Sequence, residues 1–156
     1  MLRLLLLTLA LLLAGCDSRP QFVNTDISEA GYARDFALTD HNGKPRTMAD
    51  FRGKAVVIFF GYTQCPDVCP TTMTGMAEAM KLLGGDAAKV QVLFVTVDPE
   101  RDTQQLLAQY VPVFNPSFLG LFADAQTIAR TAQEFRVFYK KQPGSTPTTY
   151  TVDHSA

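Results

Sequence analysis

Two cysteines in one short stretch, residues 61–70, are the side chains of this sequence best suited to chemistry. Cys65 and Cys69 lie between an apolar run, residues 55–60, and a helical pattern that starts at Thr71. A strand, a loop with two thiols and a helix together present the thiols at a surface, whereas free core cysteines usually act as small apolar side chains. The pattern therefore predicts metal binding or thiol redox chemistry.

The spacing of the two thiols is compatible with both kinds of chemistry. Cysteines separated by three residues near the first turn of a helix have Cα atoms about 6 Å apart, a distance that a disulfide can span. The partial positive charge of the helix N-terminus is expected to lower the pKa of both thiols. Thiolates are soft ligands that select Cu(I), and an added imidazole accommodates Cu(II) as well. A third ligand would therefore distinguish copper binding from disulfide exchange.

The sequence offers two histidines, His41 and His154, as a third ligand. His41 lies in the turn 40–44, where Asn-Gly predicts a hairpin, and we expect a solvated side chain there rather than a ligand. His154 follows a Pro/Gly/Ser-rich loop near the last residue, where a lone histidine is usually solvated. A thioredoxin-like sheet would bring this part of the chain back beside the cysteines, but spacing alone does not assign His154 as a ligand.

The third cysteine, Cys16, follows a segment typical of an export signal. Residues 1–3 form a short, positively charged segment. Residues 4–13 are apolar, but they are too few to span a bilayer as a mature helix. Residues 13–16, Leu-Ala-Gly-Cys, resemble the lipobox of bacterial lipoproteins. We therefore predict a signal peptide over residues 1–15 and lipidation of Cys16, with acyl chains that anchor the protein to a membrane.

The N-terminal prediction also gives a compartment. Residues 16–34 are polar and unpatterned and are expected to form a membrane-proximal tether, and Asp17 resembles the inner-membrane retention signal of Gram-negative lipoproteins. The domain would then lie in the periplasm, anchored through Cys16 to lipid at the outer face of the inner membrane, where disulfides persist. The net charge of −1 gives no basic excess, so no nucleic-acid partner is expected.

The apolar patterns predict an α/β domain over residues 35–156, with a central sheet flanked by helices. Residues 55–60 are expected to form a central strand buried on both faces, and Pro112 is expected to break a helix that starts at Thr103. The predicted strands are 36–39, 55–60, 90–97 and 148–154, and the predicted helices are 71–83, 103–110 and 124–135. A core-facing stripe of Met73, Met76, Ala77, Met80 and Leu83 is expected on the first helix. A dithiol that opens this helix favours the thioredoxin-like version of the fold.

Three motifs in this order resemble the Sco/SenC copper chaperones: Gly-Tyr-Thr-Gln-Cys-Pro-Asp-Val-Cys-Pro at 61–70, Val-Asp-Pro-Glu-Arg-Asp-Thr at 97–103 and Asp-His-Ser at 153–155. The resemblance implies a thioredoxin-like fold. It also implies that Cys65, Cys69 and His154 bind copper, as Cu(I), Cu(II) or both. Asp67 and Asp98 are possible supporting residues around the ligands, although Asp98 is equally well explained as a loop-forming residue before Pro99.

The resemblance also implies a role. Sco/SenC proteins bind copper and help deliver it to the dinuclear copper site of cytochrome c oxidase, so the expected partners are the copper-site subunit of the oxidase and other periplasmic copper carriers. The protein would then be a metallochaperone rather than an enzyme, with weak thiol-disulfide reductase activity as an added possibility. The sequence ends two residues after His154, whereas the family continues through a hairpin partner and a C-terminal helix. We therefore expect a domain that is incomplete at its C-terminus, marginally stable and weaker in copper binding than a longer form.

Two alternatives to a copper chaperone remain open from the residues. One is a membrane-tethered thiol-disulfide oxidoreductase in which Cys65 and Cys69 cycle without a stable metal, acting on cysteines of a copper-site partner. The other is a peroxidase of the thioredoxin-like superfamily, for which no dedicated motif is evident. A structural zinc site is disfavoured, because it needs four protein ligands and the sequence offers three.

Overall fold

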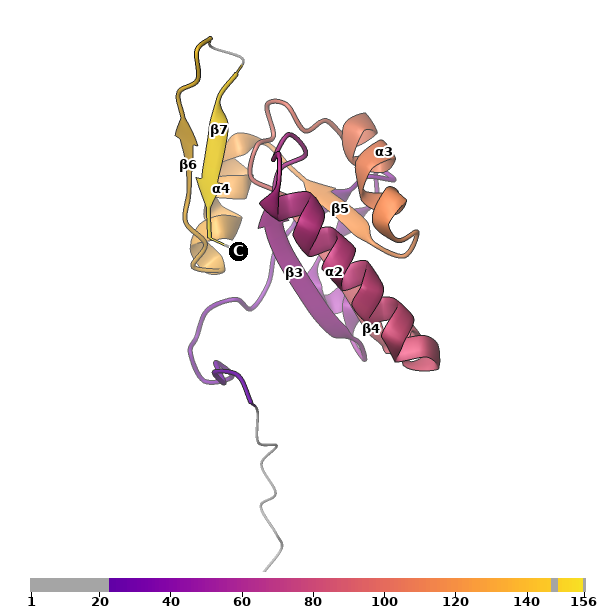
Figure 1. Cartoon of the computed structure of the whole chain (residues 1–156). Helices are drawn as coiled ribbons and strands as arrows, with labels where there is room; N and C mark the ends of the chain where they lie inside the picture. The colour runs from indigo at the N-terminus through magenta and orange to yellow at the C-terminus, as the bar shows by residue number, and fades with distance from the viewer. Residues whose placement is uncertain (1–22, 147–148, 156) are drawn as a thin grey trace, which may run out of the picture. The chain divides into compact units, whose positions relative to one another are not determined.

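The computed structural model describes residues 23–146 and 149–155 and divides the chain into two units, Met1–Gly31 and Tyr32–Ala156 (Figure 1). The described part of the first unit is irregular, with a local turn in which the backbone N–H and hydroxyl of Ser28 donate to Asp26. The second unit contains all the helices and strands described below. No helix within the described residues is long and apolar enough to cross a bilayer.

The second unit is built on a five-stranded mixed sheet with the order β2-β1-β5-β4-β3. β3 pairs parallel with β4, and β4 pairs parallel with β5, while β1 is antiparallel to both β5 and β2. The strands are β1 (Leu38–Asp40), β2 (Pro45–Arg46), β3 (Ala55–Gly61), β4 (Val90–Thr96) and β5 (Leu119–Phe122). β4 is buried along almost its whole length, which explains its continuous run of apolar residues.

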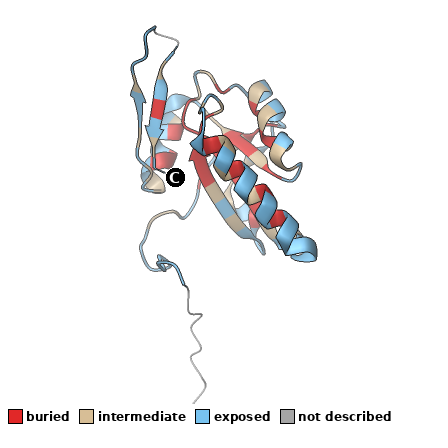
Figure 2. Cartoon of the chain, viewed as in Figure 1, coloured by how far each residue is buried: buried red, intermediate tan, exposed pale blue. Residues whose placement is uncertain are grey.

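Helices cover both faces of this sheet, which confirms the predicted α/β class. They are α2 (Val68–Leu83), α3 (Gln104–Phe114) and α4 (Ala125–Glu134), with short 3-10 segments η1 (Met48–Phe51) and η2 (Gly84–Lys89). Phe59 and Phe60 are neighbours on β3 and therefore point to opposite faces. Phe60 packs on Phe135, directly after α4, whereas Phe59 packs on Phe94, which in turn contacts Tyr110 of α3. The buried residues of both faces line the sheet (Figure 2).

A separate two-stranded sheet follows α4. β6 (Tyr139–Gln142) and β7 (Thr151–His154) pair antiparallel, with Tyr139 opposite His154 (Figure 1). The sequence analysis predicted a strand at the position of β7 but assigned residues 140–147 to a loop, so the partner strand β6 was largely missed. The charged run Lys140-Lys141 hid a strand whose side chains are mostly exposed.

Several local predictions were wrong. β3 is the edge strand of the described sheet rather than a central strand, and its first half is partly exposed, with Val57 38% exposed. Pro112 does not break α3, which continues to Phe114; Pro112 lies in the last turn, so only two helical residues follow the hydrogen bond that its missing N–H removes. α2 begins at Val68, three residues before the predicted start.

The stripe on α2 is confirmed in part. Met73, Ala77 and Met80 are buried against the sheet, and Met76 is partly buried and packs against the same core. Leu83, which was expected on the same face, is 42% exposed at the last turn of the helix. Gly84 ends the helix with a φ of +52°, a conformation that glycine adopts without steric cost.

Candidate metal centre

The thiol loop, residues 62–67, connects the end of β3 to the start of α2. Gly61, the last residue of β3, is required by packing: a Cβ there would lie 2.9 Å from the ring of Phe59 and 3.0 Å from both Cys69 Sγ and the ring of Phe94. The missing side chain of Gly61 therefore makes the space that the thiol of Cys69 occupies. A second contact, from Thr63 to Asp102, also holds the loop in place.

Asp102 is buried and binds the loop through two groups of Thr63. The backbone N–H of Thr63 donates to Asp102 Oδ2 at 3.0 Å, and its hydroxyl donates to Oδ1 at 2.6 Å. The hydroxyl of Thr96, at the end of β4, also donates to Asp102 at 2.7 Å. Burial raises the pKa of Asp102, which these hydrogen bonds partly offset. Asp102 thus ties the loop to the central strand, a role that sequence reasoning did not assign although the residue lies in a quoted motif.

The two thiols differ in exposure. Cys69 lies in the first turn of α2 and is fully buried, while Cys65 is half-buried in the loop, and both are free thiols. The backbone N–H of Cys69 points at Cys65 Sγ at a distance of 3.4 Å. The accessible thiol is therefore held by the first turn of the helix, directly in front of the buried one.

The pKa values of the thiols diverge as a result. Burial raises the pKa of Cys65, but hydrogen bonds from the backbone of Cys69 and Asp67 outweigh it, so the pKa lies below its ordinary value. Burial raises the pKa of Cys69 to about 12, and the neighbouring Cys65 adds to this effect. The prediction that the helix N-terminus lowers both pKa values is therefore wrong for Cys69, because desolvation is the larger effect there.

His154 reaches the thiols from β7. Its Nε2 lies 3.4 Å from Cys69 Sγ. The imidazole packs edge-on against the rings of Phe59 and Tyr62, with distances between ring centroids of 6.1 Å and 6.0 Å. Both aromatic side chains are buried. Burial lowers the pKa of His154, which favours the neutral imidazole that a metal requires.

Cys65, Cys69 and His154 form one cluster whose potential ligand atoms all lie within 4.8 Å of one another. Within the described ranges, no other group of three or more His, Cys, Asp or Glu side chains converges in this way. Two thiolates and an imidazole are a soft donor set that suits copper, and the set falls one ligand short of a structural zinc site. The residues present therefore fit a copper ion.

His41 is not part of this cluster, and the prediction that it is solvated is wrong. It is 8% exposed, and its Nδ1 accepts a hydrogen bond from the backbone N–H of Gly120 at 3.0 Å. A Cβ at Gly120 would lie 3.0 Å from Val111 Cγ2 and 3.2 Å from Leu107 Cβ, so this glycine lets α3 pack closely on β5. Burial lowers the pKa of His41 as well, so this histidine serves as a neutral packing residue of the sheet.

The two acidic residues expected around the site differ in position. Asp67 is exposed directly before α2, where its side chain accepts a hydrogen bond from the hydroxyl of Thr71 at 3.3 Å. Asp98 is fully buried, but its carboxylate is bound by Tyr150 and Arg101 rather than by any of the three candidate ligands. The side chain of Asp98 therefore makes more contacts than a residue that only forms a loop before Pro99 would need.

Tyr62 is the neighbour of the site that sequence reasoning missed. It is 3% exposed, and the raised pKa of its hydroxyl is caused first by burial and then modified by the backbone of Val152 and by the two thiols. Tyr62, the first residue of the thiol loop, therefore contacts both His154 and the backbone of Val152 in β7. A lone Tyr after a Gly carries no periodic signal that would reveal this role.

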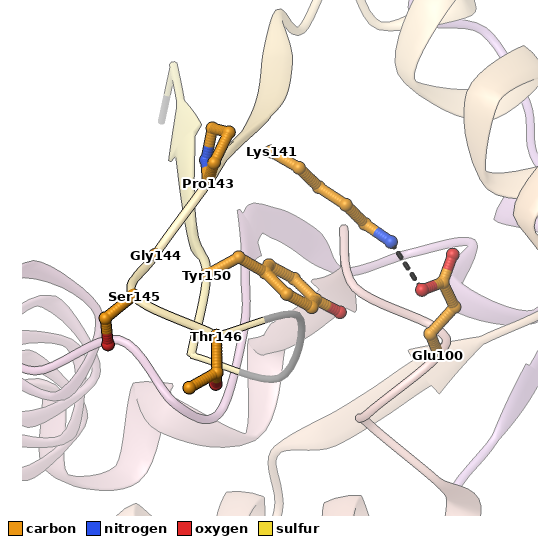
Figure 3. Close-up of a pocket in the computed structure, with 7 residues that line it drawn as sticks. All are labelled: Glu100, Lys141, Pro143, Gly144, Ser145, Thr146 and Tyr150. Atoms are coloured by element: carbon orange, nitrogen blue, oxygen red, sulfur yellow. Dashed lines mark ion pairs between the residues drawn. The ribbon is translucent and has the colours of Figure 1, made fainter.

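A pocket of about 460 Å³ lies beside the hairpin but contains none of the candidate ligands (Figure 3). Tyr150, directly before β7, is one of the residues around it, and Lys141 of β6 forms an ion pair of 2.6 Å with Glu100 there (Figure 3). The residues that line it are Glu100, Lys141, Pro143, Gly144, Ser145, Thr146 and Tyr150. The three candidate ligands therefore lie outside this pocket.

Comparisons with known proteins agree with this geometry. The SCO1/SenC family model matches residues 24–156. The SCO2 homolog of Bos taurus, a mitochondrial protein, is 44% identical over 123 residues, which cover 78% of this chain and 46% of that relative. The chain thus spans about half the length of the curated relatives it matches.

Solved structures give the same fold. ScoI of Bradyrhizobium japonicum with copper bound has a TM-score of 0.74 and 45% identity, covering 78% of this chain and 77% of that one. A SCO1/SenC family lipoprotein from Bacillus anthracis has a TM-score of 0.66 and 26% identity, covering 78% and 72%. The fold is thioredoxin-like, as predicted, and the chain belongs to the SCO1/SenC family.

Proposed function

We propose that this chain is a copper chaperone that holds copper through Cys65 Sγ, Cys69 Sγ and His154 Nε2. The observation that carries the proposal is the convergence of these three soft donors within 4.8 Å, although His154 is 85 residues away from Cys69 in the sequence. The copper-bound neighbour, which is 45% identical, supports the choice of metal. Copper is the cargo here, and the protein's task is to bind it and release it.

The unequal exposure of the thiols suggests how the cargo is exchanged. Cys65 is accessible and has a lowered pKa, so its thiolate is available to make the first bond to an arriving Cu(I) ion. Cys69 must lose its proton to solvent before it binds, because its thiol is protonated at neutral pH. On release, thiolates of an acceptor would replace the protein's ligands from the open side at Cys65.

We further propose that the acceptor is the dinuclear copper site of cytochrome c oxidase, and that other periplasmic copper carriers supply the metal. Family membership supports this role, because Sco proteins are copper-binding proteins that assist assembly of the oxidase. Cys16 lies outside the described residues, as do the whole predicted signal peptide, residues 1–15, and residues 16–22 of the predicted tether. The lipoprotein neighbour supports the proposal of a lipid anchor at the outer face of the inner membrane.

A thiol-disulfide role is the second candidate, favoured by the divergent pKa values of the thiols. The thiolate of Cys65 would attack a partner disulfide, forming a mixed disulfide and releasing one partner thiol. Cys69 would then lose its proton and attack Cys65, releasing the second partner thiol. The partner gains two electrons, and the chain is left with a Cys65–Cys69 disulfide.

One set of titrations tests the first role and separates it from the second. Cu(I) affinity is measured by competition with a chromogenic chelator, on the reduced protein, on the protein oxidised to the disulfide, and on reduced His154→Ala. We expect the tightest binding by reduced wild type, weaker binding by reduced His154→Ala and the weakest by the oxidised protein, while disulfide exchange by His154→Ala stays close to that of wild type. Equal copper affinity in the oxidised and reduced forms would contradict the chaperone proposal.

A further inference from the structure

The hairpin that carries His154 is not hydrogen-bonded into the main sheet. β6 and β7 pair only with each other among the described strands. A two-stranded hairpin by itself is marginally stable in water. Its position relative to the thiols must therefore be maintained by side-chain contacts, among them the ion pair between Lys141 and Glu100 and several polar contacts of Tyr150, directly before β7.

Tyr150 is bound on its hydroxyl, its ring and its carbonyl. The hydroxyl donates to Asp98 Oδ1 at 2.6 Å. The guanidinium of Arg101 lies 3.6 Å from the ring centroid, and Arg101 Nη1 donates to the carbonyl oxygen of Tyr150 at 2.9 Å. Lys141 lies over the ring at 4.8 Å, beside the pocket in Figure 3. This residue is therefore fixed in both position and orientation.

The groups that bind Tyr150 belong to the same segment that supports the thiols. Asp98 follows β4, and its backbone N–H donates to Thr96 Oγ1 at 3.0 Å. Arg101 forms an ion pair with Asp98 and also donates from Nη1 to Gln64 Oε1, in the thiol loop, at 3.1 Å. One guanidinium therefore contacts the loop that carries Cys65 and the residue that precedes the strand of His154.

We propose that Asp98, Arg101 and Tyr150 form a clasp that positions His154 against the two thiols, with Tyr150 as the positioning residue. This inference rests on the proposed copper site but concerns different residues, none of which contacts the metal ligands directly. β7 is an extended segment of four residues, so fixing Tyr150 at one end restricts where His154 can lie at the other. Val152, 4% exposed, adds a hydrophobic anchor in between.

The clasp makes a specific statement about Tyr150→Phe. This variant keeps the ring under Arg101 and removes only the hydroxyl bound to Asp98. Because Val152 still packs in the core, we expect the protein to remain folded while residues 151–154 become more mobile. Copper affinity should fall roughly tenfold, the amount typical of losing one hydrogen bond to a charged group.

Tyr139→Phe is the matched control. Tyr139 lies in the same hairpin, and within the described part of the chain its hydroxyl makes no hydrogen bond. Tyr139→Phe therefore removes an equivalent phenol hydroxyl from β6 and leaves Asp98, Arg101 and Tyr150 unchanged. We expect copper affinity and hairpin mobility close to those of wild type for this control.

A double-mutant cycle shows whether Tyr150 acts through His154. Cu(I) affinity is compared among wild type, Tyr150→Phe, His154→Ala and the double variant. If the clasp works by positioning the imidazole, Tyr150→Phe costs about tenfold in the wild-type background and almost nothing in the His154→Ala background. An equal loss in both backgrounds, or no loss in wild type, would overturn the inference.

A metal-free readout keeps the clasp distinguishable from the copper site itself. Amide hydrogen exchange of residues 151–154 is measured on the reduced apo protein, together with the rate at which Cys65 reacts with a thiol reagent. We expect faster exchange in Tyr150→Phe and an unchanged thiol rate. If wild type failed to bind copper, the proposed function would fail, while the exchange data would still decide whether the clasp holds the hairpin; unchanged exchange would reject it.

Discussion

The thiol loop and the histidine hairpin are attached to the fold in different ways. The loop continues β3, a strand that is paired residue by residue with β4. Gly61 packs closely beside Cys69, and Asp102 accepts a hydrogen bond from Thr63 of the loop. The hairpin pairs only with itself in the described part of the chain and meets the rest of the domain through side chains. Two of the candidate ligands thus lie in a loop and a helical turn that are anchored to the main sheet, and the third lies in a hairpin held by a few contacts.

This difference suggests a division of labour between the ligands. Thiols that are already held in place when copper is absent lose little conformational entropy when the metal binds, which favours binding. A histidine on a separately held hairpin can move away without unfolding the domain, which would open the metal to an acceptor. The predictions below test this asymmetry, beginning with the largest expected effect.

Removal of a thiol should cost more copper affinity than removal of the imidazole. Cys69→Ser replaces a buried soft ligand by a hydroxyl, and we expect a loss of Cu(I) affinity on the order of a thousandfold, given the preference of Cu(I) for thiolates. His154→Ala should lose about tenfold to a hundredfold, since two thiolates remain. Competition titrations of both variants measure the contrast; a larger loss in His154→Ala would reverse the assigned roles.

Copper affinity should also rise with pH, and the proton involved belongs to Cys69. With a pKa of about 12 in the metal-free protein, Cys69 is protonated at neutral pH and must release one proton on binding. His154, whose pKa is lowered, is already neutral there, and Cys65 titrates below its ordinary range. Above the pKa of Cys65, affinity should increase about tenfold per pH unit. A pH-independent affinity between pH 7 and 9 would contradict this assignment.

Gly61→Ala tests how tightly the rigid region is packed. The added methyl group would meet the rings of Phe59 and Phe94 and the thiol of Cys69 at 3.0 Å or less, so we expect a loss of about 1–3 kcal/mol in the free energy of unfolding. Gly75→Ala in α2 is the control, because a Cβ there has nothing within 4 Å. In that helix interior the change should stabilise the protein by roughly 0.5–1 kcal/mol. Chemical denaturation of the metal-free variants measures both; similar midpoints would show that the space beside Cys69 is not limiting.

The parts of the fold that the sequence predicts well are those with a local signal. β4 and α4 follow from an apolar run and from residues such as Ile128 and Ala132 at helical spacing, and Asp124 caps α4 by accepting a hydrogen bond from Thr127. The start of α2 was predicted less accurately, at Thr71 instead of Val68, because the apolar pattern of the helix begins only after Pro70, which lies in the third position. Such errors move an element without changing the fold.

The long-range contacts of the site have no comparable signal. The proximity of His154 to Cys69 joins residues 85 positions apart, and only the family resemblance pointed to it. The buried His41 accepts a hydrogen bond from the backbone N–H of Gly120, on another strand and 79 positions away. The raised pKa of Cys69 depends on how deeply the first turn of α2 is packed, which motif spacing does not encode. These properties are set by tertiary packing.

X-ray absorption spectroscopy of the Cu(I)-loaded protein tests the central claim most directly. Wild type should show two sulfur ligands and one nitrogen ligand, with the multiple scattering of an imidazole. His154→Ala should lose the imidazole signal and keep both sulfurs. A two-sulfur site in wild type, or an imidazole signal that persists in His154→Ala, would contradict the account of copper held by Cys65, Cys69 and His154.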